Sequence, residues 1–263
     1  MRYERRLVRG TPLWLGRTPD GRVARIDRRF EDVVRGTNTW DPSYQADPDL
    51  ETARLLAPVV PSKVVCIGLN YRRHAEEMNK PVPSEPLMFL KPSTSVIAGG
   101  EPIVLPADSD EVHHEGELAV VIGRTARDVP EDRADDYILG YTLMNDVTAR
   151  DIQRREQRYT RAKGFDTFAP LGPAIVAGLD PNALHIETRV NGVVRQTSGV
   201  DDLIFPIPKL VAFVSRVMTL LPGDVISTGT PSGVGPIRAG DQVEVSIAEI
   251  GTLSNPVLAP PGA

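Results

Sequence analysis

Short apolar runs separated by polar turns recur along most of the chain and predict β-strands. Each run is only a few residues long and rich in Val, Ile, Leu or aromatic side chains, and Gly, Pro or Asp residues bound it. Beyond residue 60 these runs predict strands at residues 64–68, 87–90, 103–105, 117–123, 137–145, 174–176, 186–190, 225–228 and 242–247. The core is therefore predicted to be mostly β.

Helical spacing of apolar residues is restricted to a few segments. It is clearest at residues 208–218, and weaker signals follow Asn70 and cover residues 149–159. A chain with many short strands and few helices indicates a mostly β fold of the α+β class.

The first 60 residues differ from the rest of the chain. Short apolar stretches and Gly- or Pro-containing turns at residues 2–27 predict one or two hairpins, and residues 41–61 read as an Asp- and Pro-rich connector. We therefore expect a small N-terminal domain at residues 1–59 and a catalytic domain at residues 60–263.

Composition narrows the class of partner. The 263 residues are 41% hydrophobic and 25% charged, as in a globular protein, and the net charge of −5 gives no broad cationic surface for nucleic acid or anionic lipid. Small molecules are the expected partners. The chain shows neither a secretory signal nor a membrane-spanning run, which favours the cytoplasm. The single cysteine, Cys66, lies in an apolar run and is predicted to be structural.

Three acidic residues lie at the ends of predicted strands. Glu115 and Glu117 precede or open the strand at residues 117–123, and alternation along a strand places both carboxylates on one face. Asp146 follows the strand at residues 137–145. Carboxylates held so close repel one another, so a cation, a shared proton or basic side chains must compensate them. Such a three-oxygen face is how magnesium and manganese commonly bind.

Other interpretations of these residues stay open on spacing alone. The two glutamates could be solvated charges at a strand end, with Asp146 capping a helix. Zinc is a further alternative because His113 and His114 adjoin the glutamates, but neighbouring strand residues point to opposite faces and no second His or Cys pair has zinc-finger spacing. An all-oxygen site is favoured over a zinc site.

A candidate base lies in the polar segment after Asn70. His74 and Glu77 are three residues apart in a predicted helical turn, so Glu77 can orient the imidazole and raise its basicity for activating water. The polarity of this segment and the prolines that follow it indicate a lid that orders over substrate. An exposed turn with an incidental His–Glu contact is the alternative.

Two further segments carry candidate anion-binding groups. Lys163 lies near aromatic residues, where an ammonium group could pair with a substrate carboxylate or stabilise an enolate oxygen, although an isolated lysine is more often solvated. The Gly-rich loop at residues 227–235 lacks the Gly-Lys-Ser/Thr ending of a phosphate-binding loop. Its backbone amides and the Thr230 hydroxyl could receive a carboxylate.

Taken in order, these segments resemble the fumarylacetoacetate hydrolase family. The resemblance extends over roughly residues 60 to 255. It rests on Gly68-Leu69-Asn70-Tyr71 with His74 and Glu77, Phe89-Leu90-Lys91-Pro92, the run from His114 to Gly123, Asn145-Asp146-Val147-Thr148-Ala149-Arg150-Asp151, Lys163-Gly164-Phe165-Asp166-Thr167-Phe168, and the run from Thr228 to Gly235.

The resemblance implies a fold, a cofactor and a set of site residues. The fold would be a mixed β-sandwich roll with a small N-terminal β domain, usually a homodimer. The metal would be Mg²⁺ or Mn²⁺, less often Ca²⁺. The implied metal ligands are Glu115, Glu117 and Asp146, the implied catalytic residues are His74, Glu77 and Lys163, and the implied substrate contacts are Gln153, Thr230, Gly229 and Tyr71.

The resemblance also implies a reaction. We expect an enzyme of aromatic catabolism that hydrolyses a C–C bond in a 2,4-dioxo acid, such as an acylpyruvate or fumarylpyruvate, through a metal-stabilised enolate. The alternative is isomerisation or decarboxylation of 2-hydroxyhepta-2,4-diene-1,7-dioate, 5-oxopent-3-ene-1,2,5-tricarboxylate or oxaloacetate. A metabolite-binding protein without activity is a remoter alternative.

Overall fold

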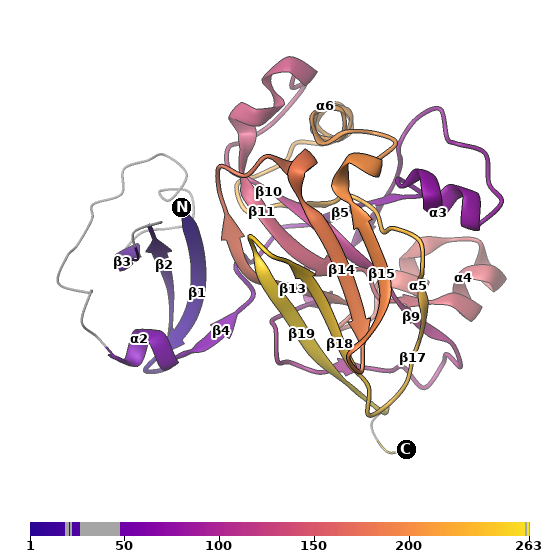
Figure 1. Cartoon of the computed structure of the whole chain (residues 1–263), viewed down its shortest axis with the longest axis horizontal. Helices are drawn as coiled ribbons and strands as arrows, with labels where there is room; N and C mark the ends of the chain where they lie inside the picture. Colours follow the sequence, from indigo (N-terminus) through magenta and orange to yellow (C-terminus); the bar gives the residue numbers. More distant parts are fainter. Residues whose placement is uncertain (19–20, 22, 27–47, 261, 263) are drawn as a thin grey trace.

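The strands of the described chain form three sheets (Figure 1). The computed structural model describes residues 1–18, 21, 23–26, 48–260 and 262. The largest sheet runs in the order β3 (Val23–Ile26), β2 (Thr11–Arg17), β1 (Arg2–Val8), β13 (Ala169–Val176), β11 (Ile138–Asn145), β10 (Gly116–Ile122), β16 (Val225–Ser227), β5 (Val64–Gly68) and β6 (Leu87–Lys91), with β4 (Arg54–Leu56) on β1 and β7 (Val96–Ile97) on β13.

Two smaller sheets complete the β architecture. One runs in the order β15 (Val193–Gly199), β14 (His185–Val190), β18 (Gln242–Ile247), β19 (Gly251–Leu258) and β8 (Ile103–Val104). The other joins β12 (Thr148–Ala149), β9 (Val112–His114) and β17 (Gly235–Ile237). The expected mostly β, α+β fold is confirmed.

The helices are short and lie around the sheets. The α-helices are α2 (Pro48–Thr52), α3 (Arg72–Glu77), α4 (Arg150–Glu156), α5 (Tyr159–Lys163) and α6 (Ile207–Val217), and the 3₁₀ helices are η2 (Ser93–Ser95), η3 (Glu131–Tyr137), η4 (Pro181–Ala183) and η5 (Val200–Asp202). Helices α3, α4 and α5 lie on the side of the molecule opposite the N-terminal strands (Figure 1). No helix of the described residues is long and apolar enough to cross a membrane.

Strands at the centre of the largest sheet are buried on both faces. In β5, Val65 and Ile67 belong to the main core, whereas Val64 and Cys66 belong to a second core on the opposite face. This explains why these strands read as continuous apolar runs rather than as alternating ones. Cys66 is fully buried, as expected of a structural thiol.

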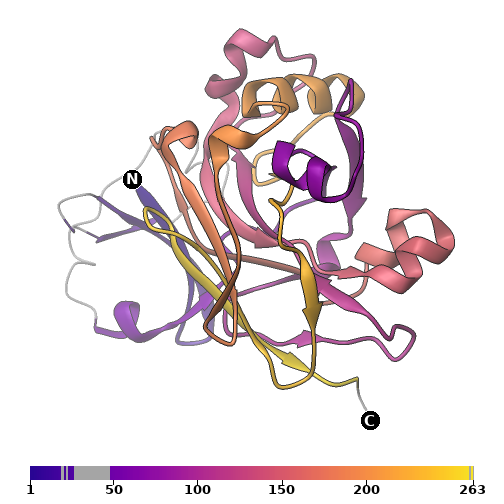
Figure 2. The same ribbon diagram turned by 45° about the vertical axis from the view of Figure 1, so that its right-hand side comes forward.

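Helix α6 covers the main core at one end of the molecule (Figure 2). Leu210, Val211 and Val214 form its buried stripe, and a proline at its first turn fits the start of a helix, where the missing N–H costs no bond. The predicted helix at residues 208–218 is confirmed with a shift of one residue.

Several boundaries differ from the prediction for local reasons. The expected helix at residues 149–159 divides into α4 and α5 because Gln157 takes a left-handed backbone conformation, with φ of 51°. Strand β15 was not predicted because most of its residues are polar and exposed. Strand β19 was not predicted because it contains Pro256, which reads as a strand breaker.

The N-terminal strands extend the largest sheet. Strands β1 and β2 form the expected hairpin around Arg9 and Gly10, and β1 also pairs with β13. The expected connector at residues 41–61 lies partly outside the described residues, up to residue 47, and its described part contains α2 and β4. The boundary at residue 59 stays a prediction.

Candidate metal centre

The three predicted carboxylates gather because β10 and β11 pair in an antiparallel register. Gly116 lies opposite Asn145, so Glu115 just before β10 meets Asp146 just after β11, and the Asp146 N–H donates to the Glu115 carbonyl at 2.8 Å. One carboxylate oxygen from each of Glu115, Glu117 and Asp146 lies within 4.8 Å of the others, and all three residues are buried. The expectation that both glutamates face the same way is confirmed.

The peptide between the two glutamates is held tightly. A Cβ atom on Gly116 would lie 2.0 Å from the Thr188 hydroxyl, so no other side chain fits here without a rearrangement. The Gly116 N–H donates to Gln196 Oε1 at 3.0 Å, and its carbonyl accepts from the Thr230 hydroxyl at 3.0 Å. Gln196 and Thr230 therefore fix the strand position that aims both carboxylates.

Cationic side chains contact two of the carboxylates. Lys163 Nζ donates to Glu115 Oε2 at 2.8 Å and to Asp146 Oδ2 at 2.6 Å. Lys91, fully buried at the end of β6, donates to Asp146 Oδ1 at 2.5 Å, and Arg150 forms an ion pair with Glu115. These contacts hold the Glu115 and Asp146 carboxylates in place.

Sequence reasoning assigned no role to Lys91 or Arg150. Both lie inside the segments that carry the family resemblance, at the end of a predicted strand and four residues beyond Asp146. A lysine closing an apolar strand is a signal of a buried pair, because an unpaired buried ammonium group would be costly. The sequence could not identify Asp146 as the partner of Lys91, because the two residues meet through pairing between distant segments.

Glu117 is the carboxylate without a cation. Its Oε2 atom accepts from the Ser227 hydroxyl at 2.5 Å and from the Gly229 N–H at 3.0 Å, both neutral donors. Burial, followed by the charges of Asp146 and Glu115, raises the pKa of Glu117 well above its ordinary value. A bound cation would offset the free-energy cost of keeping Glu117 charged, so the site fits a divalent ion that prefers oxygen ligands.

The charges around Glu115 act in the opposite direction. Burial alone would raise the pKa of Glu115, but the positive charges of Arg150 and Lys163 outweigh it and hold that pKa below its ordinary value. Burial would likewise lower the pKa of Lys163, but Asp146 and Glu115 raise it above its ordinary value. Glu115 therefore stays charged beside the charged Lys163 ammonium group.

A cavity of about 470 Å³ opens beside the carboxylates. Its wall combines predicted site residues with apolar side chains such as Leu87 and Phe89. The Lys163 ammonium group lies 4.9 Å from the centre of the Phe89 ring, so the expected aromatic neighbour comes from β6. The predicted site residues that line the cavity are His74, Glu115, Glu117, Asp146, Gln153, Lys163 and Thr230.

Tyr71 and Gly229 are placed differently from the other predicted contacts. Tyr71 is fully buried in the main core and does not line this cavity, and its hydroxyl has no hydrogen-bond partner among the described residues. The Gly229 N–H is used by Glu117 rather than pointing to a substrate. Neither residue lines the cavity, and the sequence alone could not separate residues of the cavity wall from residues buried outside it.

The predicted lid residues contact each other and the opposite loop. His74 Nδ1 lies 3.0 Å from Glu77 Oε2, and Glu77 Oε1 accepts from the Gly233 N–H at 3.1 Å. Gly233 has φ of 95°, and a Cβ atom there would lie 2.0 Å from the Arg195 carbonyl. Glu77 thus orients the imidazole and joins α3 to the loop that carries Thr230.

The two histidines beside the glutamates point away from the cavity. His113 Nε2 lies 2.9 Å from Glu111 Oε1, and His114 Nδ1 lies 3.2 Å from Gln196 Oε1. Neither histidine lines the cavity. The all-oxygen site is therefore favoured over zinc, as the strand alternation predicted.

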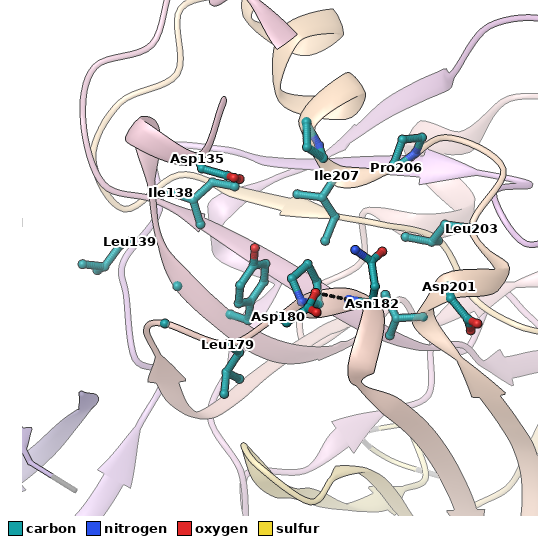
Figure 3. Close-up of a pocket in the computed structure, with 16 residues that line it drawn as sticks. Asp135, Ile138, Leu139, Leu179, Asp180, Asn182, Asp201, Leu203, Pro206 and Ile207 are labelled. Atoms are coloured by element: carbon teal, nitrogen blue, oxygen red, sulfur yellow. Dashed lines mark hydrogen bonds between the residues drawn. The ribbon is translucent and has the colours of Figure 1, made fainter. Parts of the chain in front are cut away.

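A larger cavity of about 670 Å³ lies elsewhere, between η3, η5 and the start of α6 (Figure 3). Asp135, Asp180 and Asp201 line it, and none of the described Lys, Arg or His residues does. Burial, followed by Asp135 and Asp180, raises the pKa of its Tyr141 to about 12. Such a wall disfavours an anionic oxo acid, so the smaller cavity is the candidate active site.

Solved structures of two enzymes are similar to this chain in sequence and in fold. The structure of 5-carboxymethyl-2-hydroxymuconate delta-isomerase from Mycobacterium smegmatis is 47% identical, with a TM-score of 0.88 over 98% of this chain and 100% of that chain. Fumarylpyruvate hydrolase from Pseudomonas aeruginosa, in complex with Mn²⁺ and pyruvate, is 34% identical, with a TM-score of 0.72 over 78% of this chain and 92% of that chain.

Similarity also extends to a eukaryotic relative and to a family model. A mitochondrial oxaloacetate tautomerase of Arabidopsis thaliana is 45% identical over 192 residues, which is 71% of this chain and 86% of that protein. Residues 63–258 match the family model described as fumarylacetoacetate (FAA) hydrolase C-terminal. With the carboxylate cluster and the shared fold, this match over most of the chain shows that the protein belongs to the fumarylacetoacetate hydrolase family.

Proposed function

We propose that this protein is a divalent-metal-dependent hydrolase that cleaves a C–C bond in a 2,4-dioxo acid, such as an acylpyruvate or fumarylpyruvate. The observation that carries the proposal is the His74–Glu77 pair, which lies 3.0 Å apart beside a cavity shared with three carboxylates and Lys163. Hydrolysis requires a base that activates water next to a polarised carbonyl. The pair supplies that base.

Glu115, Glu117 and Asp146 would hold Mg²⁺ or Mn²⁺, with Ca²⁺ a less suitable ion. When bound, the ion would polarise the 2-oxo group of the substrate and stabilise the negative charge of an enolate. The presence of Mn²⁺ and pyruvate in the similar fumarylpyruvate hydrolase supports this choice of metal and a pyruvate product.

The residues of the chain would then move one proton through the reaction. His74 Nε2 takes a proton from water while Glu77 accepts the Nδ1–H, which fixes the tautomer and stabilises the imidazolium. The hydroxide adds to the C4 carbonyl, and the C3–C4 bond breaks with its electron pair moving to C3. His74 returns its proton to C3, which gives pyruvate and a carboxylic acid.

The supporting residues keep this arrangement in place. Lys163 would orient Glu115 and Asp146 through its two short contacts and place one positive charge beside the oxo acid. Gln153 and Thr230 line the same cavity and would contact the substrate acid, with Tyr71 and Gly229 supporting the site from outside the cavity wall.

A second candidate is proton transfer without C–C hydrolysis. The similar proteins include an isomerase and an oxaloacetate tautomerase, and one His–Glu pair can move a proton in either reaction. The candidate substrates are 2-hydroxyhepta-2,4-diene-1,7-dioate, 5-oxopent-3-ene-1,2,5-tricarboxylate and oxaloacetate, with decarboxylation as a further outcome. Hydrolysis is preferred because the base is placed on a lid segment that borders the cavity.

The test is a substrate panel measured with EDTA and with added Mg²⁺ or Mn²⁺. We expect metal-dependent release of pyruvate from acylpyruvates, and a fall in kcat of about 10²–10⁴ in His74→Ala. Release at the parental rate by His74→Ala would contradict the role of the base. Turnover of the dienedioate or oxaloacetate alone would favour the second candidate, and no turnover of any compound would leave a binding protein.

The assembly and cellular location are proposed from the family resemblance. A homodimer is expected in the cytoplasm, in keeping with small-molecule substrates rather than nucleic acid or membranes as partners. Light scattering at known concentration tests the first statement, and a mass of one chain would contradict it.

A further inference from the structure

One wall of the active-site cavity carries more positive charge than the proposed reaction uses. Arg150, Gln153, Arg154 and Gln157 all line the cavity, and their spacing of three or four residues places them on one face at α4 and its C-terminal end. Lys80, in the segment after α3, also lines it.

These cations fall into two groups by their partners. Arg150 forms an ion pair with Glu115, and Lys163 forms ion pairs with Glu115 and Asp146. Arg154 instead forms an ion pair with Glu111, which does not line the cavity, and its side chain is 62% exposed. The exposed Lys80 ammonium group has no ion pair or hydrogen bond among the described residues. Lys80 is therefore open to a ligand, and Arg154 can exchange its exposed pair with Glu111 for a pair with a ligand carboxylate.

The charge balance of the cavity indicates what that ligand carries. Four cationic side chains and three carboxylates line it, and a divalent ion on the carboxylates would leave a clear positive excess. A substrate with a single carboxylate neutralises little of it, whereas a substrate with two neutralises more. Met78, Leu87 and Phe89 also line the cavity and provide apolar contacts for the hydrocarbon part of a substrate.

We propose that Arg154 and Lys80 bind a second carboxylate at the far end of the substrate, so that the preferred substrate is a dioxo diacid of the fumarylpyruvate type rather than a simple acylpyruvate. This inference rests on the proposed function for the position of the first carboxylate. It assigns the choice of substrate to two residues outside the metal centre.

A matched substrate pair tests the assignment. Crotonylpyruvate is fumarylpyruvate with a methyl group in place of the far carboxylate. We expect wild-type kcat/KM to be higher for fumarylpyruvate, and the ratio of the two values to fall about tenfold in the double variant Lys80→Gln, Arg154→Gln, since both charges that would contact the far carboxylate are lost. Lys80→Arg with Arg154→Lys should retain most of the preference.

Two further variants separate a specific contact from general charge. Glu111→Gln frees the Arg154 guanidinium and should raise the ratio about twofold. Arg161→Gln removes another exposed arginine, which does not line the cavity and pairs with Glu156 and Asp108, and it should leave the ratio at the wild-type value. A double-variant ratio within about twofold of wild type, or an equal fall in Arg161→Gln, would overturn the proposal.

A binding measurement distinguishes failure of this inference from failure of the proposed function. 2-Oxoheptanedioate and 2-oxoheptanoate lack the 4-oxo group and cannot undergo the cleavage, but they differ in the far carboxylate. With Mn²⁺ present, calorimetry should show tighter binding of the diacid to wild type and loss of that preference in the double variant. If neither dioxo acid is cleaved but this preference holds, the reaction is wrong and the second carboxylate site stands. Equal binding of the two acids to wild type would overturn the site itself.

Discussion

Glu117 differs from its two acidic neighbours in how its charge is balanced. Lys163, Lys91 and Arg150 contact Glu115 or Asp146, whereas Glu117 accepts hydrogen bonds from the Ser227 hydroxyl and the Gly229 N–H. Its raised pKa, caused by burial and then by Asp146 and Glu115, means that without metal a proton competes for this carboxylate. The residue most dependent on the metal is therefore Glu117.

Metal affinity should consequently depend on pH. Below the raised pKa of metal-free Glu117, binding must displace a proton, so affinity falls by up to about tenfold for each unit of decreasing pH. Above that pKa, affinity no longer rises on account of this group. Mn²⁺ titrations by calorimetry in two buffers of different ionisation enthalpy should show up to one proton released per ion. Binding that releases no proton at any pH and keeps one affinity from pH 8 to pH 5.5 would contradict this assignment.

The buried carboxylate of Glu4 gives an independent prediction for stability. It accepts from Arg2 Nε and Arg6 Nε, each at 2.8 Å. Burial would raise the pKa of Glu4, but the hydrogen bonds of Arg2 and Arg6 outweigh it and lower that pKa. Because the folded pKa lies below the unfolded one, the stabilisation is present above the unfolded pKa and is lost as pH falls through the folded pKa.

Glu4→Gln should therefore lower the free energy of unfolding by about 1–3 kcal/mol at pH 7. The difference from wild type should shrink as the pH falls below about 4. Urea denaturation at several pH values checks both statements. Asp136→Asn, which breaks an exposed pair with Arg133, is the control and should leave the free energy of unfolding close to the wild-type value. An equal cost for both variants would show that Glu4 is not specially stabilised.

At the scale of elements, local patterns predicted strands that are apolar on both faces, such as β5, and strands that alternate between apolar and polar residues, such as β18. Strands β5 and β18 have the predicted bounds, and β10 and β16 differ by one residue. Edge strands and mostly polar strands, such as β15, were not predicted because their exposed positions carry few apolar residues. The carboxylate trio was predictable because alternation and strand ends are local properties.

The rest of the site could not be predicted because it depends on pairing between distant segments. Lys91 meets Asp146 across 55 residues of sequence, and the Ser227 hydroxyl meets Glu117 across 110. Spacing within one segment contains no information on such contacts. Tyr71 is an example of a residue whose place in the fold the sequence could not predict. The family resemblance implied a substrate contact, whereas the structure places Tyr71 in the core.

Helix α6 should owe its stability to its buried stripe rather than to its own propensity. Leu210 is fully buried against the main core, while Val217 on the same helix is 55% exposed. Leu210→Ala should lower the free energy of unfolding by about 2–4 kcal/mol, and Val217→Ala by less than about 0.5 kcal/mol. Equilibrium unfolding by far-UV circular dichroism measures both. A cost below 1 kcal/mol for Leu210→Ala would mean that α6 does not help to form the core.

At the scale of the whole molecule, the order of strands brings the active site together. Strands β11, β10, β16, β5 and β6 are neighbours in one sheet, although they come from segments between Val64 and Ser227. Their ends, with α3, α4 and α5, provide the proposed metal ligands, the proposed lid and the cationic wall of the cavity. The fold therefore assembles one site from side chains that are far apart in sequence.

The most direct test of this account is an Mn²⁺ titration of the purified protein near pH 7.5, followed by calorimetry. We expect one ion per chain, a loss of affinity of at least about 100-fold in Glu117→Gln, and wild-type affinity in Glu76→Gln, an exposed carboxylate on α3. Wild-type affinity in Glu117→Gln would contradict the central claim that Glu115, Glu117 and Asp146 bind the metal.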